Sequence, residues 1–194
     1  MLCPRLVAPL LLAMTLALAG PPALAQHAPA GLSAPSPLQP GDAFGENVTL
    51  PERTIVYLKG TSKWDGAFDT LIDAFKSLNE YLDKAGIKPT GSAMTIYTQT
   101  DDAGFSFEAA VPIAAAPANP PKGDIAIGQA PSGKALKFVH RGSYEAMDST
   151  YEAITNYLDD KHLDAMDLFI EEYATDPVKT DADHLVINVF VPIK

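Results

Sequence analysis

Glu171 and Tyr173 are the two residues of this sequence whose types and spacing point most directly to chemistry. They lie two positions apart in the stretch from Asp167 to Tyr173, which has the composition of a β-strand. Side chains alternate between the two faces of a strand, so the Glu171 carboxylate and the Tyr173 ring share one face with Phe169. Tyrosines on strands are often ordinary half-buried packing residues, so the pattern by itself leaves a packing role and a ligand-binding role open.

Metal, nucleophile and phosphate chemistry find little support. The histidines are scattered, and the ligand-like run at Asp181, Asp183 and His184 lies in a polar segment, where such residues are common. The sequence at 142–144, Gly-Ser-Tyr, lacks the second glycine of a nucleophile elbow, and no glycine pattern typical of a phosphate-binding loop occurs. We expect neither a metal site nor a cofactor.

The first 25 residues have the pattern of a secretory signal peptide. Arg5 precedes the apolar stretch 6–19, and the Gly-Pro-Pro sequence at 20–22 ends any helix before small residues at 23–25. The alternative is a membrane anchor, but a span needs about 20 apolar residues and this stretch is shorter. We expect cleavage before Gln26, a periplasmic or secreted product, and no stable membrane association after cleavage.

Net charge narrows the class of partner. Removal of residues 1–25 takes away Arg5 and leaves 13 basic residues against 24 acidic ones, a net charge of −11. A chain this acidic is repelled by phosphate backbones and by anionic lipid. The sequence also lacks a basic stripe and a helix-turn-helix pattern. Nucleic acid is therefore not an expected partner.

Residues 26–50 are expected to form a disordered linker ahead of one folded domain at residues 51–194. Pro29, Pro35, Pro37 and Pro40 occur among Ala, Ser and Gly, with few large apolar side chains. This composition is typical of flexible connections. The remaining residues are numerous enough to bury a core of their own.

The domain contains an internal repeat. Trp64 and Tyr144 each precede a helical stretch, and each half ends in Val-Pro-Ile, at 111–113 and at 191–193. Trp64 lies 48 residues before Pro112, and Tyr144 lies 48 residues before Pro192. We infer a duplication whose halves pack about a pseudo-two-fold axis.

Each half reads as strand, helix, strand, strand. Apolar residues recur at helical spacing from Phe68 to Leu82 and from Met147 to Leu158. Strands are expected at residues 53–59, 92–99, 105–113, 124–128, 134–140, 167–173 and 185–192. The pattern predicts an α+β fold in which two helices pack on one face of a largely antiparallel sheet, so that the opposite face is available to line a cleft.

The domain resembles the GyrI-like, or AraC-type, effector-binding family, within the wider group that includes the SOUL haem-binding proteins. The resemblance runs from about Thr54 to Lys194. It rests on the sequence His-Arg-Gly-Ser-Tyr at 140–144, an E-x-Y-x-x-D-P pattern at 171–177, and the closing Val-Pro-Ile. The family fold is a duplicated βαββ unit. Members often follow a DNA-binding domain in transcription regulators, whereas this chain has the pattern of an export signal, so a role on DNA is not carried over.

The resemblance implies that Glu171 and Tyr173 face a central pocket. A desolvated carboxylate among aromatic rings prefers a positive partner, so such a pocket would suit a flat, apolar or cationic guest. Tyr97 holds the place related to Tyr173 by the repeat, and the aromatic residues at the helix starts are further candidates. Glu108 could equally pair with a lysine, and Trp64 could simply anchor its helix to the sheet. The candidate ligand-binding residues are Glu171, Tyr173, Tyr97, Glu108, Trp64 and Tyr144.

Two functions remain open from the sequence. The first is an exported protein that captures an amphipathic small molecule in a cleft between the two halves. A cationic aromatic molecule is one such ligand. The second follows from the resemblance, because some GyrI-like proteins hydrolyse reactive electrophiles with a pocket glutamate that assists water. In that case Glu171 is the catalytic residue. Both functions require the same carboxylate and aromatic walls.

Overall fold

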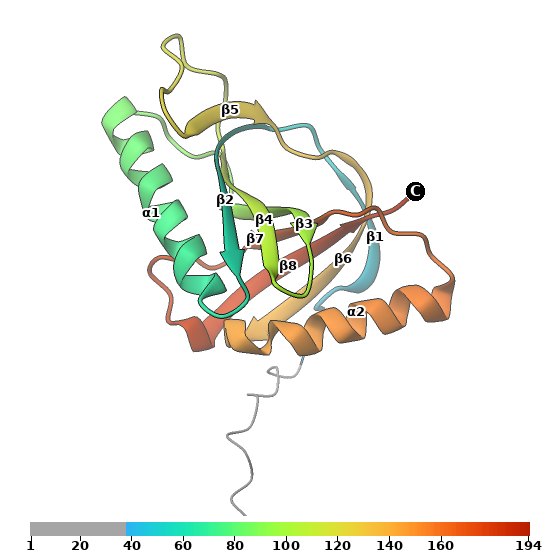
Figure 1. Cartoon of the computed structure of the whole chain (residues 1–194). Helices are drawn as coiled ribbons and strands as arrows, with labels where there is room; N and C mark the ends of the chain where they lie inside the picture. Colours follow the sequence, from blue (N-terminus) through green and yellow to red (C-terminus); the bar gives the residue numbers. More distant parts are fainter. Residues whose placement is uncertain (1–37) are drawn as a thin grey trace, which may run out of the picture. The chain divides into compact units, whose positions relative to one another are not determined.

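A computed structural model describes residues 38–194, which form an antiparallel sheet of eight strands with two helices (Figure 1). The strands are β1 (Phe44–Leu50), β2 (Thr54–Lys63), β3 (Met94–Thr100), β4 (Gly104–Pro112), β5 (Ile125–Gln129), β6 (Gly133–Gly142), β7 (Phe169–Tyr173) and β8 (Leu185–Pro192). The helices are α1 (Ala67–Ala85) and α2 (Met147–Lys161). The α+β class expected from the sequence is confirmed. The expected signal peptide lies outside the described residues.

The strand order shows how the two halves interlock. The order is β1-β6-β8-β7-β3-β4-β2-β5, so β2-α1-β3-β4 and β6-α2-β7-β8 are equivalent units that meet at the β3–β7 pair. The outermost strands are exchanged between units, because β1 precedes β2 in the chain but pairs with β6, while β5 precedes β6 but pairs with β2. The duplicated βαββ fold with pseudo-two-fold symmetry is thus present, with one further strand on each unit.

The folded part begins earlier than the expected boundary at residue 51. β1 runs through part of the proposed linker and forms a regular ladder with β6 from Glu46 to Leu50. Val48 and Leu50 pack against the apolar cluster on one face of the sheet. β1 is an edge strand, and its partner β6 lies far along the chain. Local composition does not reveal such a pairing.

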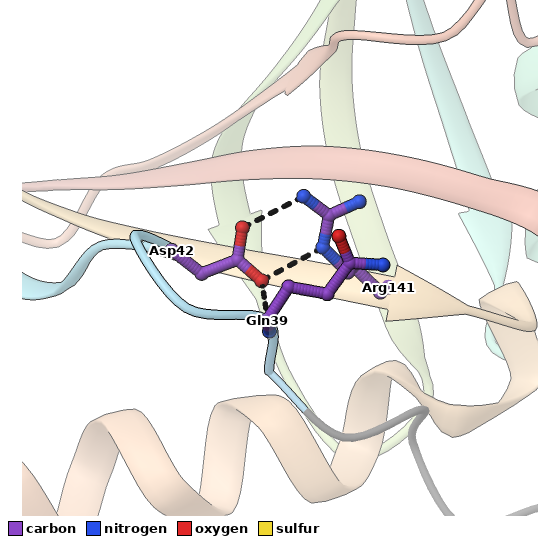
Figure 2. Close-up of polar contacts among 3 residues, drawn as sticks. All are labelled: Gln39, Asp42 and Arg141. Atoms are coloured by element: carbon purple, nitrogen blue, oxygen red, sulfur yellow. Dashed lines mark hydrogen bonds and ion pairs between the residues drawn. The ribbon is translucent and has the colours of Figure 1, made fainter.

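An ion pair attaches the segment before β1 to β6 (Figure 2). Nε and Nη2 of Arg141 donate to the two carboxylate oxygens of Asp42, each at 2.7 Å. The backbone N–H of Gln39 donates to the same carboxylate. These contacts lower the pKa of Asp42 to about 2, with the hydrogen bond from Arg141 as the main cause. Arg141 lies near the end of β6, directly before the segment that leads into α2.

Both faces of the sheet are covered. α1 and α2 pack on one face, where their apolar residues join the inward side chains of the central strands. On the opposite face Ile55, Met94, Ile96 and Phe190 form a second buried cluster. The expectation that this opposite face lines a cleft is therefore wrong, because β3 and its neighbours carry apolar side chains on both faces. Neither helix among residues 38–194 is long and apolar enough to cross a membrane.

Candidate functional site

The first turns of α1 and α2 lie close together (Figure 1). A cavity of about 1020 Å³ opens between them and the sheet. The first unit contributes residues 64–69 and Tyr97, and the second contributes residues 143–145, 147–148 and Tyr151 with Phe169 and Glu171. The turns at 100–102 and 182–183 complete the wall. The cavity is thus on the helix-covered face, and residues of both units line it.

Glu171 lies at the inner end of this cavity and is fully buried. Its Oε2 accepts hydrogen bonds from the hydroxyls of Tyr97 and Tyr173, each at 3.0 Å. Its Oε1 accepts one from Tyr151 of α2 at 2.8 Å. Three tyrosines, from β3, β7 and α2, therefore hold one carboxylate.

The hydrogen positions in this network favour the ionised carboxylate. Tyr97 gives its hydrogen to Glu171, so its oxygen accepts from Tyr144, 2.8 Å away. By the same reasoning Thr95 donates to Tyr173 at 3.3 Å. In this arrangement the three hydroxyls in direct contact all donate to an ionised carboxylate, whereas a protonated carboxyl would have to donate one of these bonds itself.

The pKa of Glu171 reflects two opposing effects. Burial raises it to about 6, and the hydrogen bonds from the tyrosines keep it from rising further. Burial also raises the pKa of Tyr97, Tyr151 and Tyr173 well above the usual value, so these residues are neutral donors. At neutral pH the cavity therefore holds a buried negative charge that tyrosines solvate.

This charge breaks the symmetry of the fold. Tyr97 and Tyr173 are equivalent positions, because each pairs with the residue five places before the proline that ends β4 or β8. The same register makes Thr95 the equivalent of Glu171, and these two residues lie directly opposite each other in the β3–β7 pair. The carboxylate thus stands beside the pseudo-two-fold axis but belongs to one unit only.

The lining of the cavity is strongly acidic. Eight of its residues are Asp or Glu, and none is Lys, Arg or His. Apart from Glu171 these carboxylates are exposed at the rim. The ion pairs found among residues 38–194 all involve other carboxylates. The rim residues are Asp65, Asp69, Asp101, Asp102, Glu145, Asp148 and Asp183.

Aromatic rings form much of the remaining wall. Phe68 of α1 stacks on Tyr144 of the second unit, with ring centroids 4.7 Å apart and planes inclined by 27°. Tyr151 meets Phe169 edge to face at 5.5 Å. Trp64 is 46% exposed, and its indole N–H donates to the backbone oxygen of Asp101 at 2.8 Å. The site therefore offers ring faces next to negative charge.

The structure brings together most of the residues that the sequence singled out. Trp64, Tyr97, Tyr144 and Glu171 line the cavity, and Tyr173 contacts the carboxylate from outside the lining. Glu108 lies elsewhere, because alternation along β4 turns it away from Phe107 toward the opposite face. There it pairs with Lys59 at 3.0 Å, so we remove it from the candidate site.

Sequence reasoning missed the role of Tyr151. It belongs to the apolar stripe of α2, where a tyrosine is usually a packing residue. Its hydroxyl is the one polar atom among the side chains of Met147, Tyr151, Ile154 and Leu158, apart from the thioether of Met147. A hydroxyl in an otherwise apolar stripe was the available signal, since a buried hydroxyl needs a hydrogen-bond partner.

His140 connects the two segments that carry Tyr144 and Tyr151. Its Nε2 lies 3.0 Å from the carbonyl oxygen of Ser143 and therefore carries the hydrogen, because a carbonyl only accepts. Its Nδ1 then accepts from Thr150 of α2 at 2.7 Å. Burial lowers the pKa of His140, which keeps the ring neutral at pH 7. Within residues 38–194 no group of three or more His, Cys, Asp or Glu side chains could hold a metal ion.

Comparison with known proteins places this geometry in a family. Residues 46–194 match the model of the GyrI-like small molecule binding domain. No curated protein matches the sequence. Among solved structures, EcmrR in a complex with DNA is 17% identical with a TM-score of 0.66, over 77% of this chain and 56% of EcmrR.

Two further solved structures are similar over 77% of this chain. A hydrolase encoded by lin2189 from Listeria innocua is 13% identical with a TM-score of 0.53, and 91% of it is covered. SAV2435 bound to tetraphenylphosphonium is 16% identical with a TM-score of 0.52, and 93% of it is covered. At these identities the likeness concerns the fold.

Proposed function

The chain belongs to the GyrI-like small molecule binding domain family, and from that premise we propose that its cavity captures a bulky aromatic cation. The observation that carries the proposal is Glu171, a fully buried carboxyl group that accepts hydrogen bonds from three tyrosines, and these bonds favour its ionised form. A buried charge is costly without a partner of opposite sign. The cavity lining contains no basic residue, so a cationic ligand supplies that partner.

The walls suit the apolar part of such a ligand. A cation over an aromatic ring gains about 0.5 to 2 kcal/mol, with the larger values in desolvated sites. A cavity of about 1020 Å³ holds a drug-sized molecule with several rings. SAV2435, which has the same fold, is bound to tetraphenylphosphonium, an aromatic cation of this kind.

A pair of ions with equal shape and opposite charge tests the proposal. Tetraphenylphosphonium and tetraphenylborate share their four-ring geometry, so their difference in affinity reports the sign of charge that the cavity prefers. Calorimetric titration at pH 7.5 should detect binding of the phosphonium and no binding of the borate. Equal binding of both ions would mean that the cavity selects for shape alone and that the role of Glu171 is wrong.

A hydrolase would use the same carboxylate as a general base. The geometry favours binding, because both oxygens of Glu171 already accept hydrogen bonds from tyrosines and are engaged as a fixed negative charge. A product assay with an epoxide probe beside the titration separates the two functions. Turnover that Glu171→Gln abolishes would favour the hydrolase, whereas binding without turnover supports capture.

We also propose that the domain acts outside the cytoplasm. The support is the pattern of residues 1–25, in which an apolar stretch follows Arg5 and small residues precede Gln26. Fractionation and N-terminal sequencing of the protein made in bacteria should find a periplasmic or secreted chain that begins at or near Gln26. Full-length chain in the cytoplasm would contradict this proposal and leave the binding proposal in place.

A further inference from the structure

We propose that the cavity recognises dications, with one positive group received at Glu171 and a second received at the rim beside Trp64. The inference rests on the proposed function and specifies the class of ligand for the same cavity. The negative charges of the cavity lie at two depths. Glu171 is fully buried, whereas the other lining carboxylates are exposed, so one compact cation cannot neutralise both levels.

Trp64 marks the place of the second group. Its ring is 46% exposed although it is held in position, since the indole N–H bonds to Asp101 and the ring packs on Phe105 with centroids 4.9 Å apart. This contact ties the turn after β2 to the turn after β3. A large aromatic ring fixed at the mouth of a cavity offers a face to a ligand.

Two carboxylates that line the cavity together with Trp64 form no hydrogen bond or ion pair among residues 38–194. Asp65 follows Trp64 directly and Asp102 follows Asp101, and neither side chain forms a hydrogen bond or an ion pair there. Asp101 differs, because its carboxylate accepts from the backbone N–H of Ala103 and Gly104 and shapes the turn.

The first-turn carboxylates Asp69 and Asp148 have a different role. Acidic residues are favoured at helix starts because they interact with the helix dipole, so they have a structural explanation. Asp65 and Asp102 form no such contact, and together with the exposed face of Trp64 they provide a ring and two negative charges. That combination suits an alkylammonium group, which a ligand anchored at Glu171 would carry on a flexible arm.

Ethidium and propidium are the probes that test this inference. Both carry the same phenanthridinium ring, and propidium adds a quaternary ammonium on a propyl arm. Fluorescence titration of the wild-type chain at low salt should give propidium an affinity about tenfold higher than ethidium, from ion pairing and cation–π contact at the rim. The double variant Asp65→Asn with Asp102→Asn should reduce the ratio of propidium affinity to ethidium affinity to less than about twofold, since exposed charges act mainly on their neighbours.

The matched control removes two exposed charges from α2 outside the cavity, with Asp159→Asn and Asp160→Asn. It should keep the full propidium advantage. The second site would be overturned if the wild type bound both dyes with equal affinity, or if both double variants lost the propidium advantage to the same extent. Ethidium binding would in that case still support capture of a cation. Failure of both dyes to bind would overturn the proposed function itself, and this inference with it.

Discussion

The affinity for tetraphenylphosphonium should fall as the pH drops through 6, because the cation competes with a proton for Glu171. The buried carboxyl has a pKa of about 6 in the free protein. Its ionised fraction is then about 0.97 at pH 7.5 and about 0.09 at pH 5.0. A ligand that requires the ionised form should lose about tenfold in affinity between these values, or about 1.4 kcal/mol.

Glu171→Gln supplies the test of that mechanism. The variant keeps the shape and removes the charge, so it should weaken phosphonium binding at pH 7.5 by about 1.5 to 3 kcal/mol, the usual range for hydrogen bonds to charged groups. It should also flatten the pH profile. Glu172→Gln is the matched control, since Glu172 alternates with Glu171 along β7 and pairs with Arg53. Calorimetry over pH 5 to 8 measures both effects. A wild-type profile as flat as that of Glu171→Gln would show that the cation and the proton do not compete for Glu171.

Three further predictions concern the network and its supports. Tyr151→Phe removes the hydrogen bond to Oε1 of Glu171, so it should move the midpoint of the pH profile of binding upward by about one to two pH units. An unchanged midpoint would mean that this hydrogen bond does not stabilise the ionised carboxylate. The raised pKa of Glu171 also destabilises the fold as the pH rises from 4.5 to about 6. Urea unfolding should therefore show wild-type stability falling by about 1.3 kcal/mol relative to Glu171→Gln over that range, and a parallel pair of curves would contradict the shift. His140→Gln should weaken phosphonium binding several-fold, because it releases Ser143 from α2, and binding equal to wild type would show that this link does not position the site.

The sequence was sufficient for the features that depend on local periodicity. Apolar spacing along α1 and α2 and alternation along the strands identified the elements, and the matched spacing to Pro112 and Pro192 revealed the duplication. Alternation also placed Glu171 and Tyr173 on one face, which the structure confirms by their shared hydrogen bond. These inferences hold because a periodic pattern reports which face a side chain takes within its own element.

Only the tertiary structure decided which residues of other elements contact those faces. The hydroxyls of Tyr97 and Tyr151 reach Glu171 from 74 and 20 residues away, and β1 finds its partner in β6 of the other unit. The cavity lies on the helix-covered face because the opposite face carries a second apolar cluster. The ionisation of Glu171 likewise depends on burial and on hydroxyls from three elements. Register between distant strands, and the solvation of a buried charge, are set by contacts that sequence spacing does not encode.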